Sequence, residues 1–346
     1  VMTSSQDKGR ALIGTPAYEN WRAYIDGEPL LGTYEFLMFT DAWLTGEVPT
    51  GVEPYRFFNL VPIERRPGHV RAAAALRLSL HVAFAIPKME KTDQSRYHGG
   101  WMTDELAALA SLRCGIRLRS GGETRSFDVG GDPQGRPEAW DMRPEPTLSI
   151  GARGFVLPAI TRAHSMMPIL ELQSFPSLSP EQAITLVRAA RLYQDALWLA
   201  ESEPSLSWLM LVAAVEAAAS YWRSSADDPL DRLRASRPEF VAHLDSIGTP
   251  DLAHRVASEF AESVGATKRF VDFLLEHLPG PPEKRPAEWG RIDWSRKALS
   301  RAFRQIYGYR SKALHDGIPF PAPMCEPPYG HCLLYTSDAA DEEDSV

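Results

Sequence analysis

The sequence predicts an α+β protein in which a mixed α/β region is followed by a helical bundle. Three observations lead to this prediction. Residues 77–84 (RLSLHVAF) alternate apolar and polar side chains with the period of a strand, whereas the apolar patterns after Ser179 have helical spacing. The length of 346 residues is typical of two domains. We therefore expect a mixed α/β domain over residues 1–175, a helical bundle over 179–321 and a disordered tail over 322–346.

Capping and turn residues place the elements of the first domain. The segment TDELAALASLRCG is expected to be a short helix that Thr103 caps and Gly115 ends. The following segment, IRLRSGGETRSFDV, alternates on both sides of Gly121 and Gly122, which predicts a β-hairpin with its turn at that pair. Glycine and proline dominate residues 130–146, so we expect a loop there.

Two helices are expected at the start of the second domain. The first begins with a capping box of Ser179 and Gln182, with Pro180 at the first helical position. The second, from about Ser205 to Arg223, is apolar on nearly every side, as the central helix of a bundle is. This helix is short for a membrane span and carries Glu216 in its middle, so a buried core helix is the better interpretation.

The last helix is expected from about Asp293 to His315. Leu299, Phe303 and Ile306 recur along one side of it at helical spacing. Gly317 and the prolines that follow it end the helix.

The composition limits the classes of function. A net charge of −8 argues against a broad surface for polyanions, although it leaves a local basic patch open. The three cysteines are widely spaced and form no CxxC pair, so neither a disulfide framework nor a zinc site is expected. No secretory signal or membrane span is recognised. We expect a cytoplasmic protein that needs no metal or other cofactor.

The C-terminal stretch CLLYTSDAADE, Cys332 to Glu342, looks like the translation of a sequencing adapter. We therefore expect the chain from about residue 331 onward to be artefactual, and Val1 ahead of Met2 leaves the natural start open as well. The alternative is a natural acidic tail, which composition would also leave disordered.

One pair of residues near the end of the last helix suggests chemistry. Arg310 and His315 are separated by four residues. Composition alone predicts about two pairs with such a spacing, and a second one, Arg237 with His243, does occur. The spacing alone is therefore no evidence for a catalytic pair, and the surrounding sequence must decide.

The context is the sequence YGYRSKALHDG, Tyr307 to Gly317, at the end of a helix. Here the chain resembles the Apea-like branch of the HEPN superfamily. The earlier stretch YQDALWLAESEPSLSWLMLVAAVEAAA looks like the opening helix pair of that domain, with Glu216 as a supporting glutamate in an apolar helix. The resemblance covers about residues 179–321. It implies a helical bundle that dimerises with its motif helices facing one another, and often a metal-independent ribonuclease.

The residue types suit that activity. Cleavage of RNA through its own 2′-hydroxyl needs a proton acceptor, and histidine, with a pKa near 6.5, fills this role at neutral pH. It also needs charge stabilisation on the phosphoryl oxygens, for which the guanidinium fork of arginine is suited. We expect His315 and Arg310 to be the catalytic residues. Four neighbours could bind substrate, by phosphate attraction, by orienting His315 or by stacking on a base: Lys312, Ser311, Tyr307 and Tyr309.

Geometry leaves two arrangements open. Five residues on an ideal helix separate two side chains by about 140° in rotation and about 7.5 Å along the axis. Arg310 and His315 therefore share a face only if the last turn unwinds. Otherwise a working site combines residues of two chains in a homodimer, which is the arrangement that we favour.

The leading interpretation is a dimeric endoribonuclease acting on RNA, such as a toxin or defence effector, with the first domain as sensor or substrate-binding region. The alternative is a non-catalytic nucleotide-binding, RNA-binding or dimerisation module, favoured by the acidic charge and by the lack of an obvious basic track. Cations at the end of a helix also complement its dipole, which would explain Arg310, Lys312 and His315 without chemistry. Glu216 is in that case a packing carboxylate.

Overall fold

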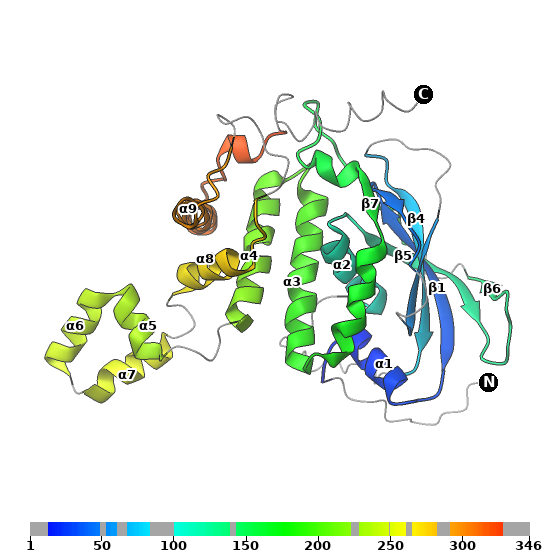
Figure 1. Cartoon of the computed structure of the whole chain (residues 1–346), viewed down its shortest axis with the longest axis horizontal. Coiled ribbons are helices and arrows are strands. Elements are labelled where there is room, and N and C mark those ends of the chain that lie inside the picture. The colour runs from blue at the N-terminus through cyan, green and yellow to red at the C-terminus, as the bar shows by residue number, and fades with distance from the viewer. Residues whose placement is uncertain are drawn as a thin grey trace. The chain divides into compact units, whose positions relative to one another are not determined.

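A computed structural model describes residues 13–48, 53–60, 68–83, 100–138, 143–222, 228–248, 250–260, 265–281 and 291–327. The fold is α+β, as the sequence predicts: an antiparallel sheet in the first part of the chain precedes a series of helices (Figure 1). The chain divides into two compact units, Val1–Met210 and Leu211–Val346. Each unit is described by itself.

The first unit contains a five-stranded antiparallel sheet with the strand order β3-β4-β1-β5-β6. Its strands are β1 (Gly32–Thr40), β3 (Tyr55–Asn59), β4 (Arg71–Leu80), β5 (Arg119–Phe127) and β6 (Arg136–Pro137). A second, two-stranded sheet pairs β2 (Trp43–Thr45) in parallel with β7 (Ala163–Ser165). The strand predicted from the alternation of residues 77–84 is confirmed over residues 77–80, where β4 ends; residues 81–83 are not in a strand, and Phe84 lies outside the described residues.

The register of the sheet sorts apolar from charged side chains. Phe36 of β1 lies opposite Leu76 of β4, and both are buried, whereas the neighbouring pair Glu35 and Arg77 forms an ion pair on the other face. Successive side chains of a strand point to opposite faces, so this alternation fixes which face of the sheet is covered.

Helix α2 (Met102–Cys114) lies between the sheet and α3 (Pro180–Leu199) and contacts both (Figure 1). Nine of its residues are buried. Leu106 and Leu109 of α2 join strand residues and Val187 of α3 in one apolar core. Four further helices complete the unit: α1 (Pro16–Ile25), η1 (Pro158–Thr161), η2 (Met167–Ser177) and the start of α4 (Pro204–Trp222).

The predicted helix ends are partly confirmed. Gly115 ends α2 with a positive φ of 66°, and Ser179 and Gln182 form the capping box of α3 through hydrogen bonds of 2.8 and 3.2 Å. Thr103, however, does not cap α2. The cap is Trp101, two residues earlier, whose backbone N–H donates to the carboxylate of Asp104, and Thr103 is fully buried inside the helix.

The predicted hairpin at Gly121 and Gly122 is wrong. Both glycines lie inside one strand, β5, which pairs with β1. The pairing shifts between Phe36 and Met38 of β1, which marks a bulge opposite the glycines. A Cβ atom on Gly121 would lie 2.6 Å from the ring of Phe39. The glycine therefore allows a close approach within the sheet, and it does not turn the chain.

The boundary between the two units lies after Met210, whereas the sequence predicts it between residues 175 and 179. The physical reason is the packing of α3. Its residues Ala183, Val187 and Ala190 are buried in the core of the first unit, against α2. The change from mixed to helical sequence at Ser179 therefore does not mark the domain boundary, because α3 still belongs to the core of the first unit.

The second unit is helical. Helices α5 (Pro229–Ser236), α6 (Pro238–Ile247) and α7 (Pro250–Glu259) pack on one another through a small apolar cluster that includes Leu233 and Val241. A second cluster joins the part of α4 after Met210 with α8 (Ala266–His277) and α9 (Arg296–His315). The predicted last helix is thus confirmed as α9, followed by a short 3-10 helix η4 (Ala322–Met324) where a disordered tail was expected. The adapter-like stretch lies outside the described residues.

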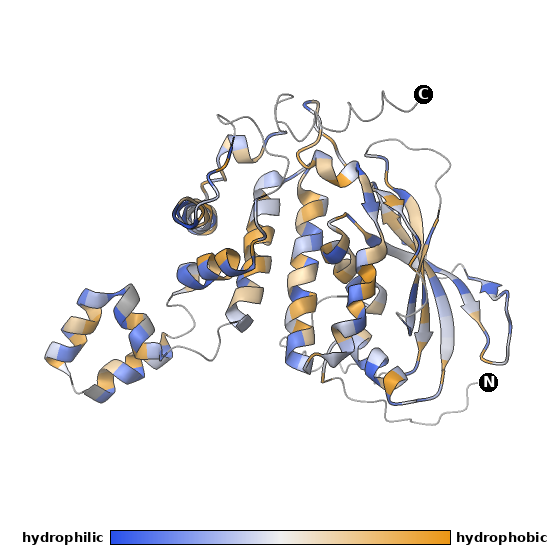
Figure 2. Cartoon of the chain, in the orientation of Figure 1, coloured by the Kyte–Doolittle hydropathy of each residue, from blue (hydrophilic) through white to orange (hydrophobic). Residues whose placement is uncertain are grey.

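Hydrophobic residues dominate α4 (Figure 2). Among the described residues it is the one helix that is long and apolar enough to cross a membrane by length and composition, which is weak evidence. Only 22% of its apolar window is buried, whereas a fully buried central helix is expected from the sequence. Most of its side chains are half-buried.

Candidate functional site

Helix α9 presents two sharply different faces. Ser295 caps its start by accepting the backbone N–H of Ala298 at 3.3 Å. Phe303, Ile306 and Tyr307 pack together with α8 and with Val212 of α4. This packing fixes the rotation of α9 about its own axis, and so decides where each candidate residue points.

Arg310 lies on the packed side of α9 and contacts Glu216 of α4. Its Nη2 atom donates to Oε2 of Glu216 at 2.8 Å, and the hydroxyl of Tyr307 donates to Oε1 of the same carboxylate at 2.7 Å. The side chains of Arg310 and Glu216 are 24% and 21% exposed. One half-buried carboxylate thus holds two residues of the predicted motif.

Tyr307 belongs to the packing of the bundle. Its ring lies 5.3 Å from that of Phe270, and the guanidinium of Arg310 lies 5.6 Å from its centre. Burial, and then the hydrogen bond to Glu216, raises the pKa of Tyr307 to about 12, so its hydroxyl is a neutral donor at any ordinary pH. The ring is thus engaged within its own unit, and its stacking on a base stays a prediction.

The geometry of α9 decides between the two arrangements that the sequence leaves open. The helix continues through His315, and the N–H of Asp316 still bonds to the carbonyl of Lys312 at 2.9 Å. Gly317, with a φ of 67°, follows. The last turn therefore does not unwind, and within one chain Arg310 and His315 stay about 140° apart in rotation.

His315 is exposed at the end of α9, on the side away from the packed face. Within the described part of the chain, its side chain makes no hydrogen bond or ion pair. Lys312 is exposed as well, and Ser311 is half-buried. The structure brings Arg310, Tyr307 and Glu216 together, and it does not bring His315 to them.

Tyr309 is also engaged within its own unit. Its hydroxyl accepts a hydrogen bond from the side-chain amide of Gln305, one turn earlier on α9. Its ring meets the buried ring of Phe320 edge-on at 6.2 Å. These contacts hold the segment after the helix against α9, and they leave Tyr309 half-buried.

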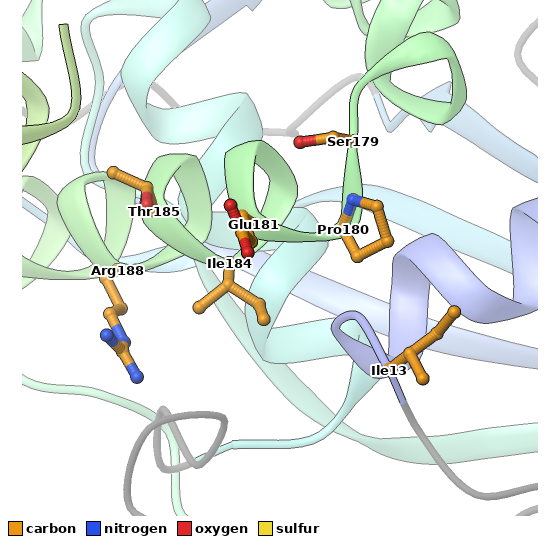
Figure 3. Close-up of a pocket in the computed structure, with 7 residues that line it drawn as sticks. All are labelled: Ile13, Ser179, Pro180, Glu181, Ile184, Thr185 and Arg188. Atoms are coloured by element: carbon orange, nitrogen blue, oxygen red, sulfur yellow. The ribbon is translucent and has the colours of Figure 1, made fainter. Parts of the chain in front are cut away.

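The described residues offer neither a metal centre nor a pocket with evident chemistry. In the ranges that the structure describes, no group of three or more His, Cys, Asp or Glu side chains could hold a metal ion. An open pocket of about 720 Å³ lies at the start of α3 (Figure 3). Its polar side chains include Ser179, whose hydroxyl already caps the helix, so we assign no chemistry to it. The pocket is lined by Ile13, Ser179, Pro180, Glu181, Ile184, Thr185 and Arg188.

Sequence reasoning missed a buried charge cluster in the first unit. Arg117 donates to Asp41 at 2.6 Å, to Glu201, and to the carbonyl of Leu197 at 2.7 Å. All three charged side chains are at most 1% exposed. The sequence gives no signal for this burial, because the alternation of residues 116–119 places Arg117 at a polar position of the predicted strand.

The geometry also shows a charge pattern that sequence reasoning overlooked. Helix α9 carries six lysines and arginines and no aspartate or glutamate. The prediction that the chain lacks a basic track is therefore wrong for this helix.

Comparison of the chain with protein-family models, with curated proteins and with solved structures found no match, and the resemblance to the Apea-like HEPN family stays a prediction.

Proposed function

We propose that the bundle of α4, α8 and α9 is the catalytic part of a metal-independent endoribonuclease that acts as a homodimer. The observation that carries the proposal is the way Glu216 holds Arg310 while His315 stays exposed. An arginine fixed by a carboxylate is preorganised, which is how a charge-stabilising group is best used. A histidine free of other partners can accept or donate a proton.

Arg310 keeps the capacity to bind phosphate. A guanidinium has five N–H donors, and Glu216 accepts from the Nη2 atom. The remaining donors can engage a phosphoryl oxygen on the side away from the carboxylate. Glu216 would be a positioning residue, and Tyr307, bonded to the same carboxylate, would support it.

The reaction that these groups support is transesterification. His315 takes the proton of a ribose 2′-hydroxyl as that oxygen attacks the adjacent phosphorus. The bond between phosphorus and the 5′-oxygen breaks, and the leaving oxygen receives a proton from a second, protonated histidine. Arg310 stabilises the negative charge on the phosphoryl oxygens. The products are a 2′,3′-cyclic phosphate and a 5′-hydroxyl.

A homodimer supplies what one chain lacks. Arg310 and His315 of one chain point about 140° apart around α9, so they do not meet on one phosphate. A two-fold axis beside α9 would place the arginine of one copy near the histidine of the other, and would supply two histidines for two proton transfers.

The test is RNA cleavage by the purified full chain, with and without a metal chelator. The His315→Ala and Arg310→Ala variants should each lose about a hundredfold or more in rate. The matched control is Arg237→Ala with His243→Ala, which removes the other pair of similar spacing on exposed positions. Equal cleavage by all variants, or products without 2′,3′-cyclic phosphate, would contradict the proposal.

One observation favours a second candidate, a non-catalytic module that binds RNA or nucleotides or mediates dimerisation. The carboxylate of Glu216 neutralises Arg310 and leaves less charge for a transition state. RNA binding that survives His315→Ala without any cleavage product would support this candidate. A change of oligomeric state in Arg310→Glu, with no change toward RNA, would instead indicate dimerisation alone.

A further inference from the structure

The exposed face of α9 carries a line of four cations, which we call the cationic stripe: Lys297, Arg301, Arg304 and Lys312. They follow one another at intervals of four, three and eight residues, which places them within about 80° around an ideal helix. All four side chains are exposed, and none of them forms an ion pair with a described residue.

The cationic stripe and the packed face lie on opposite sides of the helix. Phe303, Ile306 and Tyr307 fill the side toward α8 and α4. No large apolar side chain interrupts the stripe. A helix that lies on a membrane needs its apolar face free, and in α9 that face is already used. The stripe is therefore not the polar side of a membrane-bound helix.

Of the stripe cations, Lys312 in the last turn complements the helix dipole, but the other three do not serve the stability of α9. Lys297 lies in the first turn, where a cation opposes the helix dipole. Lys297 with Arg301, and Arg301 with Arg304, are like-charge neighbours at spacings that destabilise a helix. The whole chain, α9 included, is acidic, with a net charge of −8. Unpaired cations at unfavourable positions indicate a ligand of opposite charge.

Gly308 gives an independent indication of a ligand. It lies in the middle of the helix, between Arg304 and Lys312 on the same face. A glycine there costs roughly 1 kcal/mol relative to alanine. Packing within the chain does not require it, because a Cβ atom on Gly308 would meet nothing within 4 Å. A bare helix backbone is useful where a ligand must approach closely.

We propose that the cationic stripe binds the phosphate backbone of single-stranded RNA. Arginine forks suit phosphates, and the stripe extends about 22 Å from Lys297 to Lys312. His315 lies on the same face as the stripe, at its C-terminal end. An RNA strand that follows the stripe would thus reach His315. The identity of the ligand as RNA rests on the ribonuclease function proposed above.

The test measures binding of a fluorescent RNA of about 12 nucleotides to the full chain. The RNA carries 2′-O-methyl groups, so it cannot be cleaved and binding is read separately from catalysis. The double variant Arg301→Gln with Arg304→Gln should lose about tenfold in affinity. Its slope of log affinity against log salt should fall by about 1.4, or about 0.7 for each lost contact.

The matched control is Arg255→Gln with Arg296→Gln. It removes two exposed arginines, one on α7 and one on α9 outside the stripe, and changes the net charge equally. This control should bind RNA within about twofold of the unaltered chain. Equal losses in both double variants, or no loss in either, would overturn the stripe as the binding track.

A second variant separates binding from folding. Gly308→Ala should raise the thermal midpoint, because alanine favours the helix and finds open space, and should still weaken RNA binding. Unchanged RNA binding in this variant would count against the close approach. Tighter binding of DNA, polyglutamate or phosphatidylserine vesicles than of RNA would overturn the assignment of the ligand.

The outcomes separate this inference from the ribonuclease. If RNA binding follows the stripe and no cleavage occurs, the ribonuclease fails and the stripe stands. If cleavage depends on His315 and both double variants bind RNA alike, the stripe fails and the ribonuclease stands.

Discussion

The guanidinium of Arg310 and the carboxylate of Glu216 form an ion pair at 2.8 Å across 94 residues of sequence. Tyr307, one turn earlier on α9, donates to the other oxygen of the same carboxylate. Glu216 therefore adds a polar contact between α4 and α9 to the apolar packing that fixes the rotation of α9. His315 and the cationic stripe are parts of the same helix, so the same contacts determine where they point.

Glu216→Gln should destabilise the second unit by about 1 kcal/mol. The change keeps the shape of the side chain but weakens two hydrogen bonds to it. In a double-mutant cycle with Arg310→Gln, the two residues should show a coupling free energy of about 1 kcal/mol. Chemical denaturation measures both quantities. The control Glu276→Gln, at an exposed position of α8, should be nearly neutral, and a coupling of zero would contradict the structural role of the pair.

Tyr307 should make stability depend on alkaline pH. Its pKa rises from 10.0 to about 12 in the folded chain, so the protonated hydroxyl stabilises the fold below pH 10. This contribution is lost as the pH rises toward about 12. The stability advantage of the unaltered chain over Tyr307→Phe should therefore shrink across that interval, as measured by urea denaturation at several pH values.

The same comparison in a Glu216→Gln background provides the control. Without the negative carboxylate, the advantage of the tyrosine should depend less on pH. An advantage that stays constant from pH 10 to 12 would show that Tyr307 ionises as freely in the folded chain as in the unfolded one.

The sequence predicts well those elements whose cause is local. The capping box at Ser179, the glycine stop at Gly115 and the end of α9 at His315 all follow from a few neighbouring residues, and all are confirmed. The turn predicted at Gly121 and Gly122 is wrong because the reason for a glycine there is distant in sequence. The ring of Phe39, on another strand, occupies the space that a side chain at position 121 would fill. The predicted domain boundary is wrong for the same reason, because α3 packs in the core of the first unit together with α2.

The candidate site was predictable only in part. Arg310, Tyr307 and Glu216 were named from sequence, but their meeting at one carboxylate depends on tertiary packing. Periodicity alone could have shown the cationic stripe, because Lys297, Arg301, Arg304 and Lys312 share one helical face. The acidic net charge of the whole chain gives no sign of this stripe, because net charge says little about a single helix.

Gly121→Ala should destabilise the first unit by about 1 to 3 kcal/mol. The added methyl group would lie 2.6 Å from the ring of Phe39, in the sheet between β1 and β5, so the ring or the strand must shift. Gly130→Ala is the control, because a Cβ atom there meets nothing within 4 Å. Thermal unfolding compares the two variants, and equal effects would mean that the close approach at Gly121 is not a constraint.

The buried charge cluster around Arg117 contains two carboxylates and one guanidinium, so it has a formal charge of −1. Backbone N–H groups of Val156 and Leu157 donate to Glu201 at 2.6 and 3.2 Å and offset part of this charge. The Oδ1 atom of Asp41 finds no partner among the described residues. The cluster therefore depends on its single arginine.

Arg117→Met should destabilise the first unit by about 3 to 5 kcal/mol, because it leaves Asp41 and Glu201 buried without their cation. Adding Asp41→Asn and Glu201→Gln to Arg117→Met should recover part of the loss, since no charge is then buried. The control is Arg119→Met two residues along the chain, where the exposed pair with Asp195 is worth less than about 1 kcal/mol. Urea denaturation measures the free energies of unfolding. Similar losses for Arg117→Met and Arg119→Met would show that the cluster does not hold the first unit together, because burial is what distinguishes the two arginines.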